Sequence, residues 1–315
     1  MLPLVSIIVP TYQREKLLCE TIGYLLAQDY PNRELLIVDQ SSNHEPATAR
    51  YLDSIAGQVR YFHLAQPNLP AARNFGIRQS RGEIIFFFDD DLVIPPNTVS
   101  QLVPSYSNSD VWGLTGLVVS SSDPDREIRS AYGKFVRQEK TLFEGVTIRI
   151  GEFIGGFMSF RKAIFSRVGL FDSWIGTQPL ACNEDLEFCR RVSVAGYGLY
   201  LDTRIRIHHV ALAEGGYMRR NFPPEALAHH QLRLHLYSLL KNRRYRGWAG
   251  WVHAALLGYR GYILNRGLLR MSPFELIHKH TTFQRALKEA REAAVRNCNI
   301  TREITSSISG EYDES

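Results

Sequence analysis

Residues 84–91 read Ile-Ile-Phe-Phe-Phe-Asp-Asp-Asp, so five bulky apolar residues are followed directly by three carboxylates. An unbroken apolar run of this length, between Gly82 and Pro95-Pro96, is typical of a strand that is buried on both faces. Charged side chains are not tolerated inside such a strand, so the aspartates should follow its C-terminal end. In open α/β sheets, ligands bind at that edge.

The three aspartates, Asp89–Asp91, are called the acidic triplet below. Crowded carboxylates repel one another, and a divalent cation relieves this repulsion. If the backbone stays extended, Asp89 and Asp91 point the same way and can hold one hard metal ion. Taken alone, the triplet is equally consistent with a solvated turn or a helix cap.

Strand and helix signals alternate four times in the first ninety residues or so. Strands are predicted at 5–9, 35–38, 59–63 and 84–88, and helices from Leu17, after a Ser42-x-x-Glu45 capping box, and from Asn68 to Ser80. This alternation predicts a mostly parallel sheet with helices on both faces, which places Asp39 on the same edge as the acidic triplet. Glycine-rich dinucleotide and P-loop motifs are absent.

Beyond the acidic triplet the alternation weakens. We expect a strand at 111–119, an irregular excursion over the site at 120–150, a short helix at 163–168, a loop at 176–182, a helix from Asn183 to Gly196, and a strand at 200–207 that leads to two histidines. Asp185 lies in the first turn of its helix, where an acid can simply complement the helix dipole. The histidines can likewise be packing or surface residues.

Residues 226–274 contain eight Lys or Arg, no Asp or Glu, and interleaved aromatic residues such as Trp248, Trp251 and Tyr262. This composition suits an interfacial helix on an anionic membrane, and equally a helical subdomain with a solvated basic face. The polar residues from Ser306 onward predict a flexible tail.

Composition limits the location and partners of the 315-residue chain. The net charge of +5 gives no reason to expect a nucleic-acid partner, and the four cysteines have no Cys-x-x-Cys spacing. A strand begins almost directly after Met1, and no run of 18 uncharged apolar residues occurs. We therefore expect a cytoplasmic protein with reduced thiols that can associate peripherally with the inner face of the membrane.

Seven motifs, in order and spacing, resemble those of the family 2 glycosyltransferases, which have the GT-A fold. The resemblance covers residues 4–216 or so. The matching motifs are Val5–Tyr12, Leu36–Asp39, Ala72-Arg73-Asn74-x-Gly76, Phe88–Asp91, Val168-Gly169-x-Phe171-Asp172, Asn183-Glu184-Asp185 with Arg190-Arg191, and the histidine pair near Gly215-Gly216.

The resemblance implies roles for individual residues. The donor would be a UDP, dTDP or GDP sugar, and the metal Mn²⁺ or Mg²⁺. The implied nucleotide-binding residues are Pro10, Thr11, Tyr12, Asp39, Arg73 and Asp90; the metal ligands are Asp89, Asp91 and His209, with His208 as the weaker candidate; the general base is Asp185, with Glu184 beside it; and Gly155, Gly156 and Asn183 face the sugar or acceptor.

The resemblance also implies a division of the chain. It consists of a catalytic domain at 1–216, with a nucleotide-sugar half at 1–118 and an acceptor half at 119–216, a C-terminal helical region at 217–300, and a tail at 301–315.

The implied activity is inverting transfer of one sugar to a glycan or lipid-linked acceptor, in cell-surface or exopolysaccharide synthesis. One base and one metal suffice for inversion, whereas a retaining hydrolase needs two carboxylates about 5 Å apart. The Gln-x-x-Arg-Trp motif of processive synthases is absent, which favours single addition.

Two alternatives remain. One is a non-catalytic nucleotide-sugar or glycan-binding protein of the same fold. The other is a haloacid-dehalogenase-type phosphatase, whose motif Asp89-x-Asp91-x-Val93 matches but normally stands on the first strand.

Overall fold

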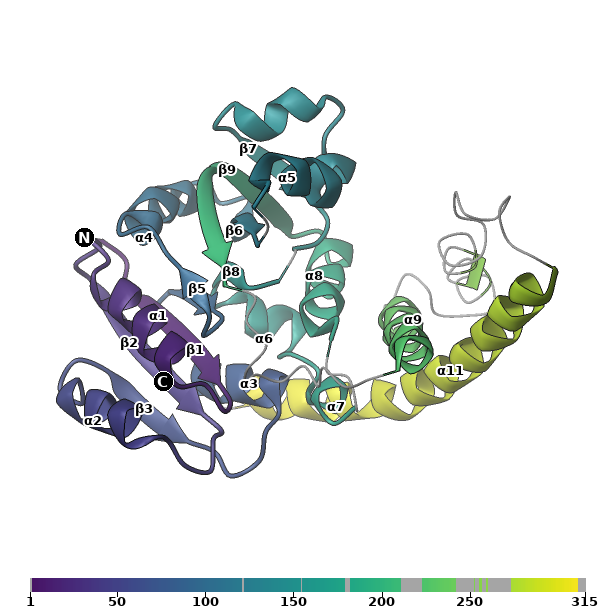
Figure 1. The fold of residues 1–315 in the computed structure, drawn as a ribbon, viewed down its shortest axis with the longest axis horizontal. Coiled ribbons are helices and arrows are strands. Elements are labelled where there is room, and N and C mark those ends of the chain that lie inside the picture. The colour runs from purple at the N-terminus through teal and green to yellow at the C-terminus, as the bar shows by residue number, and fades with distance from the viewer. Residues whose placement is uncertain are drawn as a thin grey trace.

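A computed structural model describes residues 2–120, 122–153, 155–178, 182–210, 223–241, 252, 255, 256, 259 and 273–310. The described part is an α/β fold around one mixed sheet (Figure 1). Its strands are β1 Val5–Thr11, β2 Arg33–Asp39, β3 Arg60–His63, β4 Ile84–Phe88, β5 Leu92–Val93, β6 Val111–Val119, β7 Thr147–Ile150, β8 Phe157–Arg161 and β9 Gly198–His209.

Helices cover the sheet and extend the fold beyond it. They are α1 Lys16–Leu26, α2 Pro46–Ser54, α3 Leu69–Gln79, α4 Thr98–Leu102, α5 Pro124–Tyr132, α6 Ile164–Val168, α7 Ser173–Gly176, α8 Glu184–Val194, α9 Pro224–Lys241 and α11 Pro273–Gly310, with 3-10 turns at Val103–Ser107, Gly133–Phe135 and Glu139–Phe143.

The sheet has the order β3-β2-β1-β4-β8-β6-β9-β5, and β7 pairs with β9. Strands β1 to β4 are parallel, as the alternation of strands and helices predicts. Strand β8 then pairs antiparallel with both β4 and β6, so the sheet is mixed beyond β4. The predicted α/β architecture with helices on both faces is confirmed.

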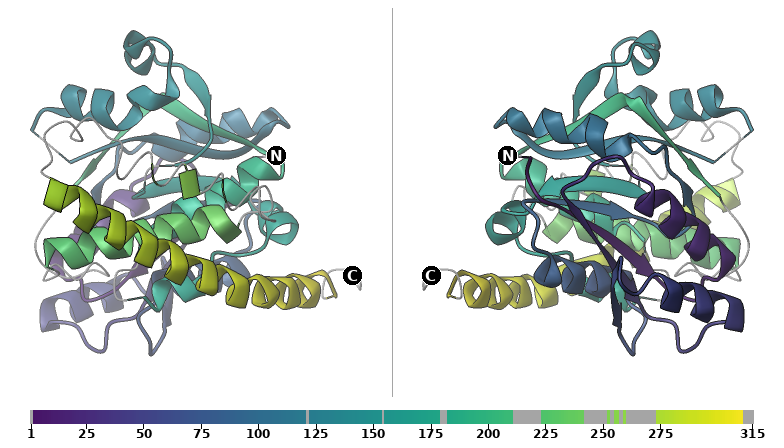
Figure 2. Two further views of the ribbon diagram at one scale, coloured as in Figure 1. Left: turned by 90° about the vertical axis from the view of Figure 1, so that its right-hand side faces the viewer. Right: turned by 90° about the vertical axis from the view of Figure 1, so that its left-hand side faces the viewer.

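Alternate residues of the strands face two separate cores. Ile7, Phe86 and Phe88 pack with α1 and α4 on one face, whereas Ile8 and Phe87 pack with α3, α6 and α8 on the other. Figure 2 shows the helices on either side of the sheet. Because β4 is buried on both faces, its apolar run ends where the sheet meets solvent, and the acidic triplet follows there.

Two local predictions were wrong. The Ser42-x-x-Glu45 capping box does not form: α2 begins at Pro46, Glu45 is extended without a side-chain cap, and the Ser42 hydroxyl donates to Asn43 instead. Proline at the first helical position sets this start. The excursion at 120–150 is also not irregular, because Asp123 caps α5 through the backbone N–H of Arg126 at 3.1 Å.

The helices α9 and α11 lie side by side and share a third core (Figures 1 and 2). Leu234, Leu236 and Tyr237 of α9 are buried with Phe283 and Ala290 of α11. The first part of the basic aromatic segment is therefore packed against protein. Trp248, Trp251 and Tyr262, like the Gly215-Gly216 pair, lie outside the described residues.

The remaining C-terminal predictions have mixed outcomes. The predicted tail at 301–315 starts inside α11, whose backbone is helical to Gly310; residues 311–315 lie outside the described residues. Within the described ranges, we find no helix with the length and apolarity needed to cross a bilayer. Cys19, Cys182 and Cys189 are free thiols.

Asn68 provides a test of the predicted start of α3. Its Oδ1 accepts a hydrogen bond from the Ala71 N–H at 3.0 Å, so Asn68→Ala should lower the free energy of unfolding in urea by about 1 kcal/mol. Asn97 is a matched control, because it stands at the N-cap of α4 and makes no side-chain cap. Equal losses for Asn68→Ala and Asn97→Ala would contradict the role of the cap.

Candidate active site

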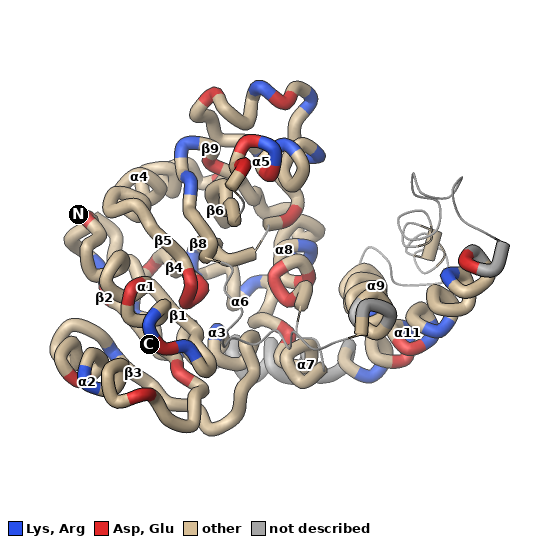
Figure 3. Tube along the Cα trace, viewed as in Figure 1, with Lys and Arg blue, Asp and Glu red and all other residues tan. Residues whose placement is uncertain are grey.

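The acidic triplet lies at the carboxyl edge of the parallel strands, as predicted. Thr11 ends β1 opposite Asp39, the last residue of β2. The Thr11 hydroxyl donates to Asp90 Oδ2 at 2.6 Å, which joins the end of β1 to the turn after β4. Figure 3 shows acidic residues just beyond β4 and others on α8.

The backbone turns at Asp90 and Asp91, so the expectation of an extended Asp-x-Asp pair was wrong. Asp89 Oδ1 lies 3.3 Å from Arg73 Nη2, whereas the two oxygens of Asp91 face Arg14 Nη2 at 2.7 Å and His209 Nε2 at 3.0 Å. The two carboxylates are therefore oriented by different cations rather than by strand periodicity.

Arg14 is a site residue that the sequence analysis missed. It is buried, and it contacts both Asp90, through Nε at 3.2 Å, and Asp91. Burial raises the pKa of Asp90 to about 7, against the opposing effects of Arg14 and Thr11. Arg14 could have been found from its position three residues after the end of β1. The end of β1 lies on the edge of the sheet that carries the acidic triplet, so a cation there can pair with these carboxylates.

Arg73 joins the acidic triplet to α8. Its guanidinium is buried and contacts Glu184 Oε1 through Nη1 at 2.7 Å and Asp89 Oδ1 through Nη2 at 3.3 Å. Glu184 is the first residue of α8, and Arg73 lies on α3. The Arg73 side chain thus brings together Glu184, 111 positions away from it in the chain, and Asp89, 16 positions away.

Asp185 lies in the first turn of α8, half-buried, beside Glu184. Asn183 stands at the N-cap position as predicted, but it is in the left-handed conformation, with φ of 68°, and its side chain makes no cap. Burial and the neighbouring Glu184 together raise the pKa of Asp185 to about 7, against the opposing effect of Arg73. A carboxylate with this pKa can accept a proton near neutral pH.

The glycine pair lies between the two groups of acids. A Cβ on Gly155 would come within 2.9 Å of Asp185 Oδ2, and one on Gly156 within 4.0 Å of Asp89 Oδ2. Gly156 has φ of 95°, and its carbonyl accepts the Asp89 N–H at 2.9 Å. The backbone of the two glycines therefore lies close to both carboxylates, and Gly155 is exposed.

The two histidines end β9 with different surroundings. His209 contacts Asp91, and this hydrogen bond raises the pKa of the imidazole. Its Nδ1 lies 3.3 Å from Ser120 Oγ. His208 is exposed and pairs with Val93. Of the two, the structure thus places His209 at the acidic triplet.

Asp39 is enclosed by protein, with none of its side chain exposed. Its Oδ1 accepts the Ser41 N–H at 2.7 Å, and its Oδ2 faces His44 Nε2 at 2.5 Å and the Tyr61 hydroxyl at 2.6 Å. The implied contact between Asp39 and a nucleotide base is therefore not available in this conformation. Nearby, Pro10 is buried and Tyr12 is half-buried.

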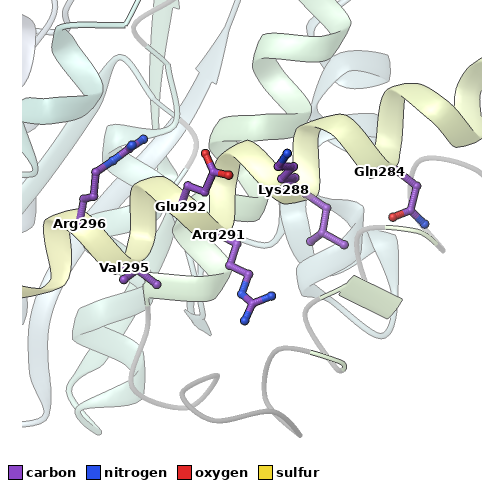
Figure 4. Close-up of a pocket in the computed structure, with 7 residues that line it drawn as sticks. Gln284, Lys288, Arg291, Glu292, Val295 and Arg296 are labelled. Carbon is purple, nitrogen blue, oxygen red and sulfur yellow. The ribbon is translucent and has the colours of Figure 1, made fainter.

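Two hollows in the described part of the chain lie away from these acids. One of about 510 Å³ follows α11, with Gln284, Lys288 and Arg291 along it (Figure 4). The other, of about 1500 Å³, lies at the opposite edge of the sheet, near Pro3 and Glu83. Arg14 and Arg73 instead occupy the space between the carboxylates of the site.

The acidic side chains and His209 do not by themselves form a metal site. Within the described ranges, no group of three or more His, Cys, Asp or Glu side chains is arranged to hold a metal ion. Asp89, Asp91 and His209 nevertheless influence one another electrostatically. Mg²⁺ is usually held by one or two carboxylates together with substrate phosphates. Asp89 and Asp91 are of the donor type that such an ion takes, although Asp91 and His209 pair with each other in this structure.

Comparisons with known proteins agree with this arrangement. The chain is 25% identical over 254 residues to an O-antigen biosynthesis protein of Myxococcus xanthus, a match covering 71% of this chain and 18% of that protein. It spans 15–17% of the length of the curated relatives that match it first.

Solved structures have the same fold. TarS of Staphylococcus aureus, solved with UDP-GlcNAc, has a TM-score of 0.60 at 18% identity over 98% of this chain and 92% of its own. The mannosyltransferase PcManGT of Pyrobaculum calidifontis, solved with GDP-Man and Mn²⁺, has a TM-score of 0.55 at 17% identity over 94% and 74%. The predicted GT-A fold is thereby confirmed.

The family model described as Glycosyl transferase family 2 matches residues 6–169, which include β1 to β4, Arg73, the acidic triplet and the glycine pair. This match covers more than half of the chain, and the chain therefore belongs to glycosyl transferase family 2.

Proposed function

We propose that this protein moves one sugar from a nucleoside-diphosphate sugar to a hydroxyl of a glycan or lipid-linked acceptor, with inversion and with a divalent metal. One observation carries the proposal: Arg73 and the Gly155-Gly156 pair bring Asp89 and Asp185 to one place. A group that can help bind a diphosphate thus lies beside a group that can accept a proton, as single displacement requires.

The residues have distinct roles in the proposed reaction. Asp89, Asp91 and His209 would hold the metal, which when bound neutralises the charge of the leaving diphosphate. Asp185 accepts the proton of the attacking hydroxyl at its carboxylate. Glu184 pairs with Arg73 and so keeps this guanidinium between the two groups of acids. The open backbone at Gly155 leaves space for the sugar or acceptor.

Several features support the wider proposal. Family membership supports a catalytic domain within residues 1–216, and the ligands of TarS and PcManGT support a UDP or GDP sugar as donor. The name of the Myxococcus relative, an O-antigen biosynthesis protein, supports a role in cell-surface polysaccharide synthesis.

The two alternatives make different predictions. A non-catalytic sugar-binding protein would not turn over any nucleotide sugar. A phosphatase would release phosphate from simple phosphate esters, and the match to family 2 gives this activity no support.

Nucleoside-diphosphate binding should depend on metal. A thermal-shift screen of nucleotide sugars with Mn²⁺ identifies the donor, because a ligand raises the melting temperature by mass action. Calorimetry with the matching nucleoside diphosphate should then show weaker binding in EDTA and recovery with Mn²⁺. Asp91→Asn should lose most of this metal response, whereas Asp53→Asn, at an exposed position of α2, should keep it. Equal affinity with and without metal would count against the assignment.

Replacement of Asp185 should slow the transfer step and leave donor binding nearly unchanged. Loss of a general base typically costs about 10²–10⁴ in rate. The wild-type single-turnover rate, followed as nucleoside-diphosphate release with water as acceptor, should also fall as pH drops below about 7, because Asp185 becomes protonated. Asp185→Asn should lack this pH dependence.

Asp125 is the matched control, since it is an acid in the first turn of α5. A role confined to the helix dipole predicts that both Asp185→Asn and Asp125→Asn lose up to about 1 kcal/mol of stability and keep their turnover. Near-wild-type turnover in Asp185→Asn would exclude Asp185 as the general base and make Glu184 the next candidate.

We also propose peripheral membrane contact through α11. Its outer face exposes Ile277 and Val295, at 63% and 68%, alongside the basic residues Arg285 and Lys288. Co-sedimentation with anionic liposomes should decrease as salt rises. Arg285→Glu with Lys288→Glu should reduce it further, whereas Lys140→Glu, near α5, should not. Recovery entirely in the supernatant at low salt would remove this proposal.

A further inference from the structure

Lys241, the last residue of α9, occupies a buried cluster of charges between the C-terminal helices and the rest of the protein. Its ammonium lies 2.6 Å from Asp172 Oδ2 and 3.5 Å from Glu187 Oε1. The three side chains expose only 5%, 9% and 1% of their surface, respectively. Removing this lysine would take away the ion-pair partner of the buried Asp172 carboxylate, and breaking a buried pair from one side is costly.

The Asp172 end of the cluster fixes α7. Asp172 Oδ1 caps this helix by accepting the Trp174 N–H at 3.0 Å, and its Oδ2 accepts hydrogen bonds from the Tyr237 hydroxyl and from Lys241. Burial alone would raise the pKa of Asp172, but Lys241, Tyr237 and Arg191 together outweigh burial, and the pKa is lowered. The Trp174 and Tyr237 rings pack at 4.4 Å. Asp172 is therefore an ionised anchor for α9.

The Glu187 end of the cluster fixes the first turn of α8. Glu187 lies two residues after Asp185, and its two oxygens also receive Arg191 Nε at 2.8 Å and Nη2 at 2.9 Å. Arg191 in turn donates to the carbonyl groups of Val168 and Leu170, at 2.6 and 2.7 Å. The carboxylates of Asp172 and Glu187 are thus balanced by the cations of Lys241 and Arg191. Of these four residues, Lys241 is the one that comes from α9.

A second contact joins α9 to α8 one turn further along. Arg190 Nη1 donates to Ser238 Oγ at 2.7 Å, and its Nη2 lies 3.3 Å from His235 Nδ1. The face of α8 that follows Asp185 is therefore held by α9 through directional polar bonds. Such bonds specify the orientation of the helix, which an apolar contact alone does less strictly.

Asp185 is the second residue of α8, so a change in the orientation of the first turn of this helix moves its carboxylate directly. A displacement of about 1 Å by a change far from the reacting atoms can cost about 10²-fold in rate. Control of the orientation of α8 is therefore control of the reacting geometry.

We propose that Lys241 is a positioning residue for sugar transfer: from the C-terminal helix α9, it sets the orientation of the first turn of α8 and hence of Asp185. This inference rests on the proposed function. It makes α9 a working part of the catalytic unit, although α9 lies beyond the boundary at 216 that the sequence suggests.

The test compares Lys241→Met, Lys241→Arg and the control Lys140→Met, whose lysine is exposed near α5. Three quantities are measured: affinity for the nucleoside diphosphate with Mn²⁺, melting temperature, and single-turnover release of the nucleoside diphosphate from the donor found in the thermal-shift screen, with water as acceptor. Lys241→Met should turn over about 10- to 100-fold more slowly per folded molecule, with affinity within about twofold of the wild type. Lys241→Arg should restore most of the rate, and Lys140→Met should match the wild type.

If Lys241→Met does not fold, Tyr237→Phe serves in its place, because it removes one hydrogen bond to Asp172 and keeps the ring against Trp174. It should slow turnover in the same direction and by a smaller factor. The inference is overturned if the folded variant turns over at the wild-type rate. It is also overturned if the variant loses nucleoside-diphosphate affinity and rate in parallel. If the wild type itself turns over no nucleotide sugar, the proposed function fails, and this inference fails with it.

Discussion

Repulsion among carboxylates at the carboxyl edge of the sheet is the constraint on which the site depends. Asp89 and the two acids that begin α8 lie within reach of one guanidinium, that of Arg73. Asp90 and Asp91 contact a second guanidinium, that of Arg14. So many like charges can lie this close only with cations between them. The site is thus ordered by ion pairs before any metal or diphosphate arrives.

The apolar scaffold holds this crowded edge in place. Phe88 ends β4 and stacks on Phe157 of the antiparallel strand β8, with ring centroids 4.7 Å apart. Because β8 pairs with β4, the Gly155-Gly156 pair just before it is brought beside Asp89. The reversal of strand direction at β8 therefore carries functional meaning, since it supplies the backbone that lies between the metal-binding and the proton-accepting groups of the proposed reaction.

The C-terminal helices are integrated with this core in two ways. The contact of α9 with α11 is mainly an apolar core of leucines, alanines and aromatic rings, with His229 and Arg233 paired to Glu289. Its contact with α7 and α8 adds buried charged and hydrogen-bonded groups, Lys241 and Arg190 among them. Apolar packing provides most of the stability of such helices, while directional bonds to α8 define how they sit on the catalytic core.

The sequence by itself determined the four leading strands, the α/β class, the family and the residues of the acidic triplet, because buried strands and their polar ends leave a local signal in apolar runs. It also identified Arg73, Glu184 and Asp185 through motifs. Only the tertiary structure decided which groups these side chains contact, since turns and long-range ion pairs have no periodicity. For this reason the sequence analysis missed Arg14 and did not indicate that Asp39 is enclosed. Nothing in the order of residues predicted the contact between Lys241 and Glu187.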